Sequence, residues 1–349
     1  MREKPETSKN RIGYFDTLRF FAAGIIFATH YIAAFSPDSF RYFHILPFSI
    51  ILDGISGKLG VAMLCVILGY FAYRKGACSS KPLVLMIADR YLFFVLTELA
   101  FFLLGAVVRY GTLKPDGWWL LRTALKESFS LGSRYYAVLW SLRPMLFGSV
   151  IAYILGRLKA PLWMCAAAAV IPACFDRVWL ASCILGAVLY RLGNAERLEG
   201  ILGKKSVRAV IFLSTFLLIR QGGRESSVIY LLDALFSAAL CLVIMKSPWL
   251  QKKLEPRRWK SVARTYFGIY LLHPMILETL GFRLLNSWLG IVFPVRFLLV
   301  FLLLSAIIIL LAIPLTAAVN AAAKFLSRGL KSFCFTVSTH LHCIVKKRK

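Results

Sequence analysis

The sequence predicts an all-α, polytopic membrane protein with about ten transmembrane helices and both termini in the cytoplasm. Hydrophobic residues make up 59% of the 349 residues and charged residues 17%, whereas soluble domains carry roughly 45–50% apolar and about 25% charged residues. The mean hydropathy is +0.71. Because one bilayer crossing takes roughly 20 apolar residues, the chain has enough for about ten. These values exclude two or three soluble domains, which the length alone would allow.

Charged residues, prolines and glycines divide the apolar sequence into ten expected spans. They cover residues 14–35, 46–73, 83–108, 135–156, 161–175, 178–192, 207–222, 226–245, 262–281 and 291–319. The fifth and sixth spans are short and form either two crossings or a broken, re-entrant pair. The last is long enough to tilt or to break near Pro314. Residues 109–134 are expected either as an amphipathic segment at the interface or as an ordered loop lining a cavity.

Lysine and arginine are distributed unevenly between the two ends of these spans. With the N-terminus inside, 28 of the 43 basic residues fall in the inner segments, as the positive-inside rule requires. Orientation and anionic lipid therefore account for most of the net charge of +27, and nucleic acid is not an expected partner. We expect a cytoplasmic segment at 1–13, a transmembrane domain at 14–319 and a basic cytoplasmic tail at 320–349.

Neither a metal site nor a disulfide framework is expected. The eight cysteines are scattered without a C-x-x-C pair or a histidine at ligand spacing, and cysteine inside a span behaves as a small hydrophobic residue. The basic N-terminus runs into an apolar stretch too long for the core of a signal peptide, so the first span is expected to remain as an anchor. The nucleophile-elbow, zincin and P-loop motifs are missing from the sequence.

The first span contains three polar side chains that a bilayer disfavours: Asp16, Arg19 and His30. Asp16 and Arg19 are three residues apart and can pair on one helix face. Arg19 and His30 are eleven residues apart, about three turns, so they share a face and lie roughly 16 Å apart along the axis. A guanidinium can hold an anion, and an imidazole can take a proton from a hydroxyl near neutral pH. The alternative is structural: the charged pair marks the interface and His30 is a buried, hydrogen-bonded histidine.

Polar residues in the later spans are the remaining candidates. Each has a structural alternative, such as snorkelling to the interface or compensating the backbone near a proline. They are Lys58, Arg90, Glu98, Arg143, Tyr270 and His273. Glycines 54, 57, 60 and 69 are expected to allow close helix packing. We predict that Arg19 and His30 line one water-accessible cavity with Arg90 nearby, and that His273 is mainly structural because Pro274 frees the Tyr270 carbonyl.

Several motifs together resemble the membrane acyltransferase-3 family. Tyr14-Phe15-Asp16, Arg19, ten further residues and then His30 resemble the first-helix signature of that family. Later stretches are similar to its other landmarks in the same order: G-x-x-G-V at 57–61, LGYF at 68–71, LWSL at 139–142, ILGA at 184–187 and YLLHP at 270–274. The resemblance covers almost the whole chain. The family often has an arginine pair at the start of the third span, but here Arg90 stands without a second arginine.

The resemblance implies a multi-pass enzyme of the bacterial plasma membrane. It would transfer an acyl group, commonly acetyl from acetyl-CoA, to a hydroxyl of a cell-surface polysaccharide or lipid-linked sugar. His30 would be the catalytic histidine, Arg19 would orient or bind the donor, and Arg90 and Lys58 are further candidates for donor binding. The resemblance also implies a stand-alone type without an extracellular hydrolase domain. Two other classes remain open: a glycan or lipid transporter or flippase, and a non-catalytic membrane sensing module.

Overall fold

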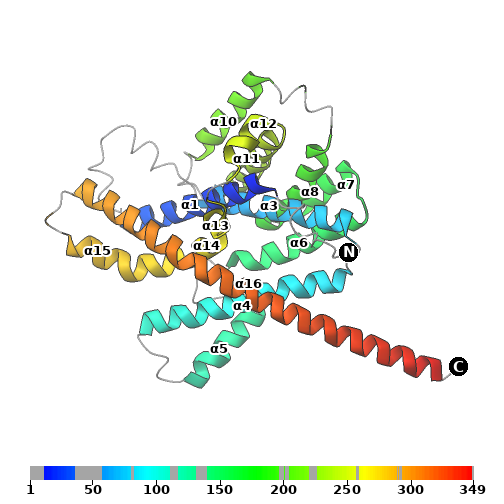
Figure 1. Ribbon diagram of the computed structural model, residues 1–349. Helices are drawn as coiled ribbons and strands as arrows, with labels where there is room; N and C mark the ends of the chain where they lie inside the picture. The colour runs from blue at the N-terminus through cyan, green and yellow to red at the C-terminus, as the bar shows by residue number, and fades with distance from the viewer. Residues whose placement is uncertain are drawn as a thin grey trace, which may run out of the picture.

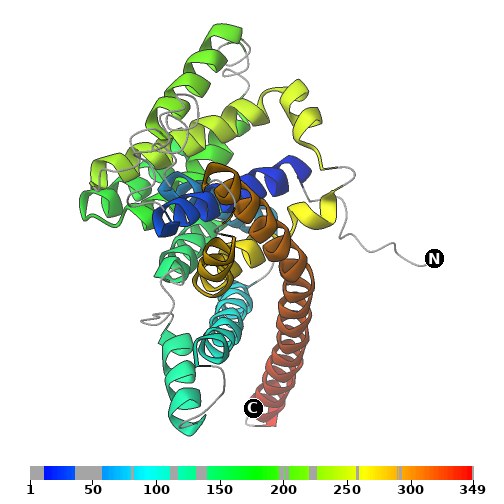
Figure 2. The same ribbon diagram turned by 90° about the vertical axis from the view of Figure 1, so that its left-hand side faces the viewer.

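In the computed structural model of the chain, every regular element among the described residues is helical (Figures 1 and 2). The described residues are 12–35, 57–79, 82–110, 117–130, 140–195, 200, 204–219, 226–256, 259–288, 290 and 293–347. The all-α prediction is confirmed for these residues. The first parts of the expected spans at 46–73 and 135–156 lie outside them.

The helices follow the expected spans closely, with additional short helices between them. Their bounds are α1 Gly13–Phe35, α3 Gly57–Cys78, α4 Leu83–Tyr110, α5 Gly117–Ser130, α6 Leu142–Arg157, α7 Leu162–Cys174, α8 Val178–Gly193, α10 Lys205–Ile219, α11 Ser227–Met245, α12 Pro248–Leu254, α13 Lys260–Ala263, α14 Tyr266–Ile276, the π-helical turn η5 Leu277–Gly281, α15 Phe282–Ser287 and α16 Phe293–Lys347.

Among the described residues, four helices are long and apolar enough to cross a membrane. They are Gly13–Phe35, Gly57–Cys78, Ser227–Met245 and the part of α16 from Val295 to Leu326. Helices α7 and α8 are apolar but shorter. The 13 residues of α7 extend about 20 Å, less than the roughly 30 Å of a bilayer core, so a re-entrant pair remains open. These helices support a membrane protein, while the count of ten and the cytoplasmic termini stay predictions.

Glycines bring α3 and α8 into backbone contact at the centre of the molecule. A Cβ atom added at Gly69 would lie 1.6 Å from the carbonyl oxygen of Cys183, and one at Gly186 would lie 2.3 Å from that of Val66. On α1, the backbone of Ala22 approaches α3 in the same way, since a Cβ at Gly60 would lie 2.6 Å from its oxygen. Close packing is therefore confirmed for the described glycines of the second span, whereas Gly54 lies outside the described residues.

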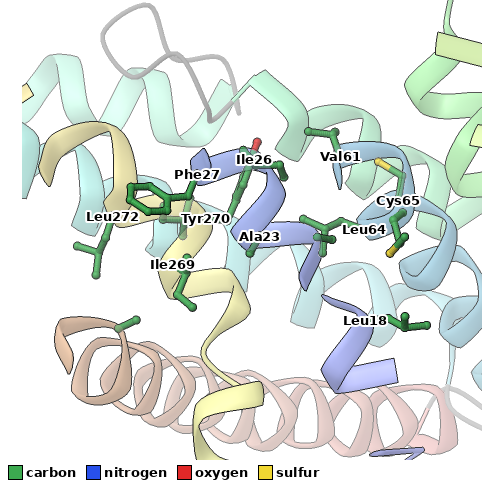
Figure 3. Close-up of a cluster of buried hydrophobic side chains, with 14 of the residues drawn as sticks. Leu18, Ala23, Ile26, Phe27, Val61, Leu64, Cys65, Ile269, Tyr270 and Leu272 are labelled. Atoms are coloured by element: carbon green, nitrogen blue, oxygen red, sulfur yellow. The ribbon is translucent and has the colours of Figure 1, made fainter. Parts of the chain in front are cut away.

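The largest buried cluster joins α1, α3 and α14. Figure 3 shows side chains from these three helices in the cluster, among them Phe27 of α1, Leu64 of α3 and Tyr270 of α14. Phe27 also stacks on Phe301 of α16, with ring centroids 5.2 Å apart. This core fixes the first helix, which carries Arg19 and His30, against α14, which carries His273.

Two of the segments predicted to be cytoplasmic, 191–208 and 246–264, contact each other, and the second also contacts the start of α1. The Thr17 hydroxyl, near the start of α1, donates to the Leu254 carbonyl at the end of α12 (2.5 Å). The Lys246 ammonium donates to the Ala195 carbonyl (3.1 Å). These bonds join the start of α1 to the segment at 246–264, and that segment to the one at 191–208. Which side of the membrane these segments face stays a prediction.

The last helix is longer and more continuous than expected. Helix α16 runs from Phe293 to Lys347 through Pro314, so of the two alternatives, a tilt or a break near Pro314, the break is wrong. Gly268 of α14 packs against residues on both sides of the proline: a Cβ at Gly268 would lie 2.7 Å from Thr316 Oγ1 and 3.0 Å from Ala312 Cβ. This packing holds the helix together where one backbone hydrogen bond is lost. The tail is helical as far as Lys347 and extends past the other helices (Figure 1).

Residues 117–130, within the stretch expected at the interface or along a cavity, form α5. This helix folds back along α4 (Figure 1). The Tyr91 hydroxyl of α4 donates to the carbonyl of Phe129 near the end of α5 (2.6 Å). The segment is therefore an ordered partner of α4.

Candidate active site

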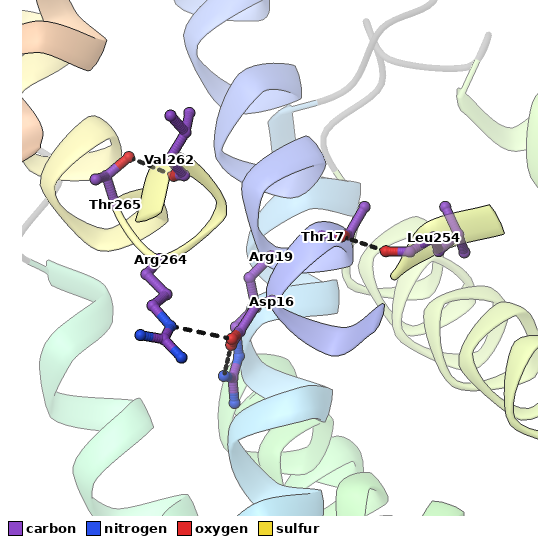
Figure 4. A network of polar contacts seen from close by, with 7 residues as sticks. All are labelled: Asp16, Thr17, Arg19, Leu254, Val262, Arg264 and Thr265. Atoms are coloured by element: carbon purple, nitrogen blue, oxygen red, sulfur yellow. Dashed lines mark hydrogen bonds and ion pairs between the residues drawn. The ribbon is translucent and has the colours of Figure 1, made fainter. Parts of the chain in front are cut away.

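Asp16 is the buried centre of a charged network at the start of α1 (Figure 4). Its carboxylate is 1% exposed, and the Arg19 guanidinium lies 3.4 Å from Oδ1. The Nε atom of Arg264 lies 4.0 Å from Oδ2. The spacing of Asp16 and Arg19 predicted their pairing, but Arg264, just before α14, has no sequence signal that distinguishes it from the other basic residues of its segment.

Arg19 is held between α3 and α14 by aromatic rings. Its guanidinium carbon lies 4.7 Å from the ring centre of Phe71 and 5.3 Å from that of Tyr266. Such cation–π contacts favour a fixed guanidinium position. Phe71 belongs to the LGYF stretch, and Tyr266 lies shortly before the YLLHP stretch. Neither was predicted as a site residue.

Arg90 of α4 adds a further positive charge to this region. It interacts electrostatically with Arg19 and with Tyr266, and in the part of the chain that the structure describes it has no hydrogen bond or ion pair. Arg19 and Arg264 thus pair with the Asp16 carboxylate, and Arg90 adds its charge beside Arg19. We call these four residues the arginine cluster. Its excess of positive charge suits an anion such as a phosphate group.

The structure places His273 against His30. Their ring centroids are 5.0 Å apart. His273 is fully buried, and its Nδ1 atom lies 3.3 Å from the Ile269 carbonyl oxygen. Its Nε2 atom has no hydrogen-bond partner among the described residues. His30 is exposed in the chain taken alone. The two imidazoles, here called the histidine pair, form one unit in which His273 is the buried member.

Arg19 and His30 both face α14. Arg19 lies over Tyr266, and His30 contacts His273. Tyr266 and His273 are seven residues apart, about two turns of helix or roughly 10 Å. The arginine cluster and the histidine pair therefore lie along the same seam between α1 and α14. A water-accessible cavity along this seam stays a prediction.

Tyr270 connects the histidine pair to α6. Its hydroxyl is 2.9 Å from the hydroxyl of Ser141, and both side chains are buried. Its ring centroid lies 6.1 Å from that of His273. Ser141 belongs to the LWSL stretch, so two motifs far apart in the sequence meet at this hydrogen bond.

The other predicted residues lie apart from the arginine cluster. Lys58 donates a hydrogen bond to the Tyr230 hydroxyl. Arg19 contacts Phe71 of α3. Lys58 lies thirteen residues, or roughly 20 Å, from Phe71 along the same helix. Lys58 and Arg19 therefore do not lie side by side, and a role of Lys58 in donor binding stays a prediction.

Glu98 and Arg143 lie between α4, α5 and α6. Glu98 is fully buried, and neither of its carboxylate oxygens has a hydrogen-bond partner among the described residues. Arg143 interacts electrostatically with Glu98 and donates to the Ser130 carbonyl (2.8 Å). These contacts place both residues beside α5. Among the described residues, no group of three or more His, Cys, Asp or Glu side chains is arranged to hold a metal ion.

A family model described as an acyltransferase domain matches residues 12–317. The chain belongs to the acyltransferase-3 family. The match includes the arginine cluster, the histidine pair and α14, and it confirms the resemblance seen in the sequence motifs. No curated protein and no solved structure matches the chain. Together with its apolar helices, membership of the acyltransferase-3 family identifies the protein as a membrane acyltransferase.

Proposed function

We propose that this acyltransferase-3 protein transfers an acyl group, most simply acetyl, from acyl-CoA to a hydroxyl of a cell-surface glycan or lipid-linked sugar. The observation that supports this best is the seam along α14, where an arginine cluster and a histidine pair lie on the same side of α1. The arginine cluster suits an anionic donor, and the histidine pair suits proton transfer. The proposed place of action is the bacterial plasma membrane, with the protein as a multi-pass enzyme.

The arginine cluster is the proposed site for the phosphate groups of the donor. Arg19 is oriented by Asp16 and by two aromatic rings, so little side-chain freedom is lost when it binds an anion. Arg90 supplies a second guanidinium without a competing ion pair among the described residues. A phosphate group would therefore meet at least two charge-assisted donors.

His30 is the proposed general base. The acceptor hydroxyl attacks the thioester carbonyl as its proton passes to an imidazole nitrogen of His30. The new C–O bond forms, the C–S bond breaks, and the proton returns from His30 to the leaving CoA sulfur. His273 holds the His30 ring in place through their 5.0 Å ring contact, while its own Nδ1 atom lies beside the Ile269 carbonyl. His273 is thus a positioning residue, as its burial in the core requires.

The test uses purified full-length protein and radiolabelled acetyl-CoA, with glycan and lipid-linked sugar fractions extracted from the cells that make it. His30→Ala and His30→Gln should lower the transfer rate by about 10²–10⁴, the usual cost of losing a general base. His273→Gln should retain more activity, because an amide can replace its bond to the backbone. Expression level and thermal stability are measured for each variant.

Near-wild-type transfer by a folded His30→Ala protein would refute the mechanism. If wild-type protein transfers no acetyl group but moves labelled lipid-linked sugar across reconstituted vesicles, the transporter hypothesis replaces the enzyme. A fully active His273→Gln variant with a wild-type pH profile would remove His273 from the mechanism, whereas a shifted profile would support its positioning role.

A further inference from the structure

Three aromatic side chains line up at the end of the molecule opposite the arginine cluster. The rings of Trp140 and Trp179 meet edge to face with centroids 5.2 Å apart. Trp179 stacks on Tyr230 at 5.5 Å, with 29° between the ring planes. The three residues come from the segment before α6, from α8 and from α11, and Trp140 remains 42% exposed. A ligand approaching this end would therefore meet an aromatic surface.

Two charged side chains complete this group. The Lys58 ammonium lies 4.4 Å from the ring centre of Tyr230 and donates to its hydroxyl. It also attracts the carboxylate of Asp233, one turn further along α11. We call Lys58, Trp140, Trp179, Tyr230 and Asp233 the aromatic cluster.

Asp233 is a buried carboxylate that the fold does not satisfy. It is fully buried, and neither carboxylate oxygen has a hydrogen-bond partner among the described residues. A buried carboxylate without such bonds is costly, and the cost is recovered when a ligand donates hydroxyl hydrogen bonds. It is also the sole acidic residue of the apolar span at 226–245, a signal by which the sequence could have identified it.

The charge balance of the aromatic cluster differs from that of the arginine cluster. Among the described residues, the aromatic cluster contains one lysine and one aspartate, whose formal charges cancel. The arginine cluster contains three arginines and one aspartate. An anion would be attracted to the arginine cluster but would meet the Asp233 carboxylate in the aromatic cluster. A neutral ligand with several hydroxyl groups avoids this repulsion, and its C–H faces can pack on aromatic rings.

The aromatic cluster is joined to the histidine pair through adjacent residues. Trp140 is followed directly by Ser141, whose hydroxyl is 2.9 Å from that of Tyr270. Tyr270 in turn lies 6.1 Å, ring to ring, from His273. A ligand on Trp140 would therefore lie next to the polar contacts that lead to His30.

We infer that the aromatic cluster binds an uncharged sugar ring of the acceptor, stacking it on Trp140 and Trp179 and accepting its hydroxyl hydrogen bonds at Asp233. The role of this sugar as acceptor rests on the proposed function. The binding itself does not, so the two can be tested separately.

The binding test uses full-length protein in lipid nanodiscs, which avoid sugar-containing detergents, and ligand-observed NMR. The probes are the methyl glycosides of glucose, galactose, mannose and rhamnose, with the methyl glycosides of glucuronic and galacturonic acid as anionic counterparts. At least one neutral glycoside should bind saturably and more tightly than the anionic ones. Trp179→Ala should weaken that binding by about 2- to 12-fold, the loss of one aromatic stacking contact.

Two further variants make the test specific. Trp163→Ala removes a tryptophan of α7 that is 72% exposed and outside the aromatic cluster, and it should bind the neutral glycosides as wild type does. Asp233→Asn keeps the side-chain size but removes the negative charge of the cluster, so it should weaken neutral binding and strengthen binding of the uronic acid glycosides. This reversal of preference would not arise from a general loss of folding.

The inference is overturned if no neutral glycoside binds at about 10 mM, a concentration that would detect millimolar affinity. It is also overturned if Trp179→Ala, folded by its thermal transition, binds as wild type does. If glycosides bind as expected but the protein transfers no acetyl group, the sugar site stands and the proposed enzymatic function fails. If the protein transfers acetyl groups to extracted glycan but binds no glycoside, the proposed enzymatic function stands and the sugar site fails.

Discussion

Replacing Gly69 by alanine should separate the two central helices. The added Cβ would lie 1.6 Å from the Cys183 carbonyl oxygen, nearly 2 Å short of ordinary contact, which begins at 3.4 Å. A backbone carbonyl inside a helix cannot rotate away, so α3 and α8 must move apart or the chain must bend. Overpacking typically costs 1–3 kcal/mol, and a backbone clash of this depth places Gly69→Ala at about 3 kcal/mol or above.

The buried cysteines supply the assay. Cys65 and Cys183 are free thiols buried in the core, while Cys78 and Cys174 are free and exposed. A thiol-reactive fluorophore added during heating reports when the buried thiols become accessible, after the exposed ones have reacted. Since 1 kcal/mol shifts Tm by roughly 2–4 °C in domains of 150–250 residues, Gly69→Ala should lower the transition by at least about 6 °C.

Gly24→Ala is the matched control. A Cβ at Gly24 meets nothing within 4 Å, and alanine is favoured over glycine in a helix by roughly 1 kcal/mol. This variant should therefore unfold at the wild-type temperature or slightly above it. A Gly69→Ala protein with a wild-type transition would refute the close approach of α3 and α8, together with the packing on which the placement of Trp179 depends.

Three further predictions concern charge and topology. Asp16→Asn should lower Tm by several degrees, because removing one partner of a buried ion pair leaves uncompensated charge; an unchanged Tm would contradict its role as the counter-ion of the arginine cluster. Arg90→Gln should raise KM for acetyl-CoA roughly tenfold or more, the value of one charge-assisted contact. The control Arg157→Gln, which loses a bond to the Ser79 carbonyl, should leave KM unchanged. Single cysteines at positions Lys204 and Lys253 should react with a membrane-impermeant reagent from the same side, and labelling from opposite sides would refute the predicted topology.

The amino-acid sequence by itself determined where the long apolar helices lie and which polar residues within them are candidates for a functional role. The first expected span, 14–35, agrees with α1 at Gly13–Phe35 to within one residue, because a bilayer selects apolar runs of a definite length. Arg19 and His30 were predicted from one helical repeat and the cost of burying polar groups. Both arguments are local, since they require only residues within a single helix.

The tertiary structure alone decided which polar groups meet. Sequence spacing fixes the angle between two side chains on one helix but not how helices far apart in the sequence are rotated against each other. For that reason the sequence did not predict the contact of His273 with His30 or the contact of Lys58 with Tyr230. Arg264 joined Asp16 without any sequence signal. These contacts depend on how α1, α3, α11 and α14 pack together, and that packing is set by glycines and buried side chains spread over the whole chain.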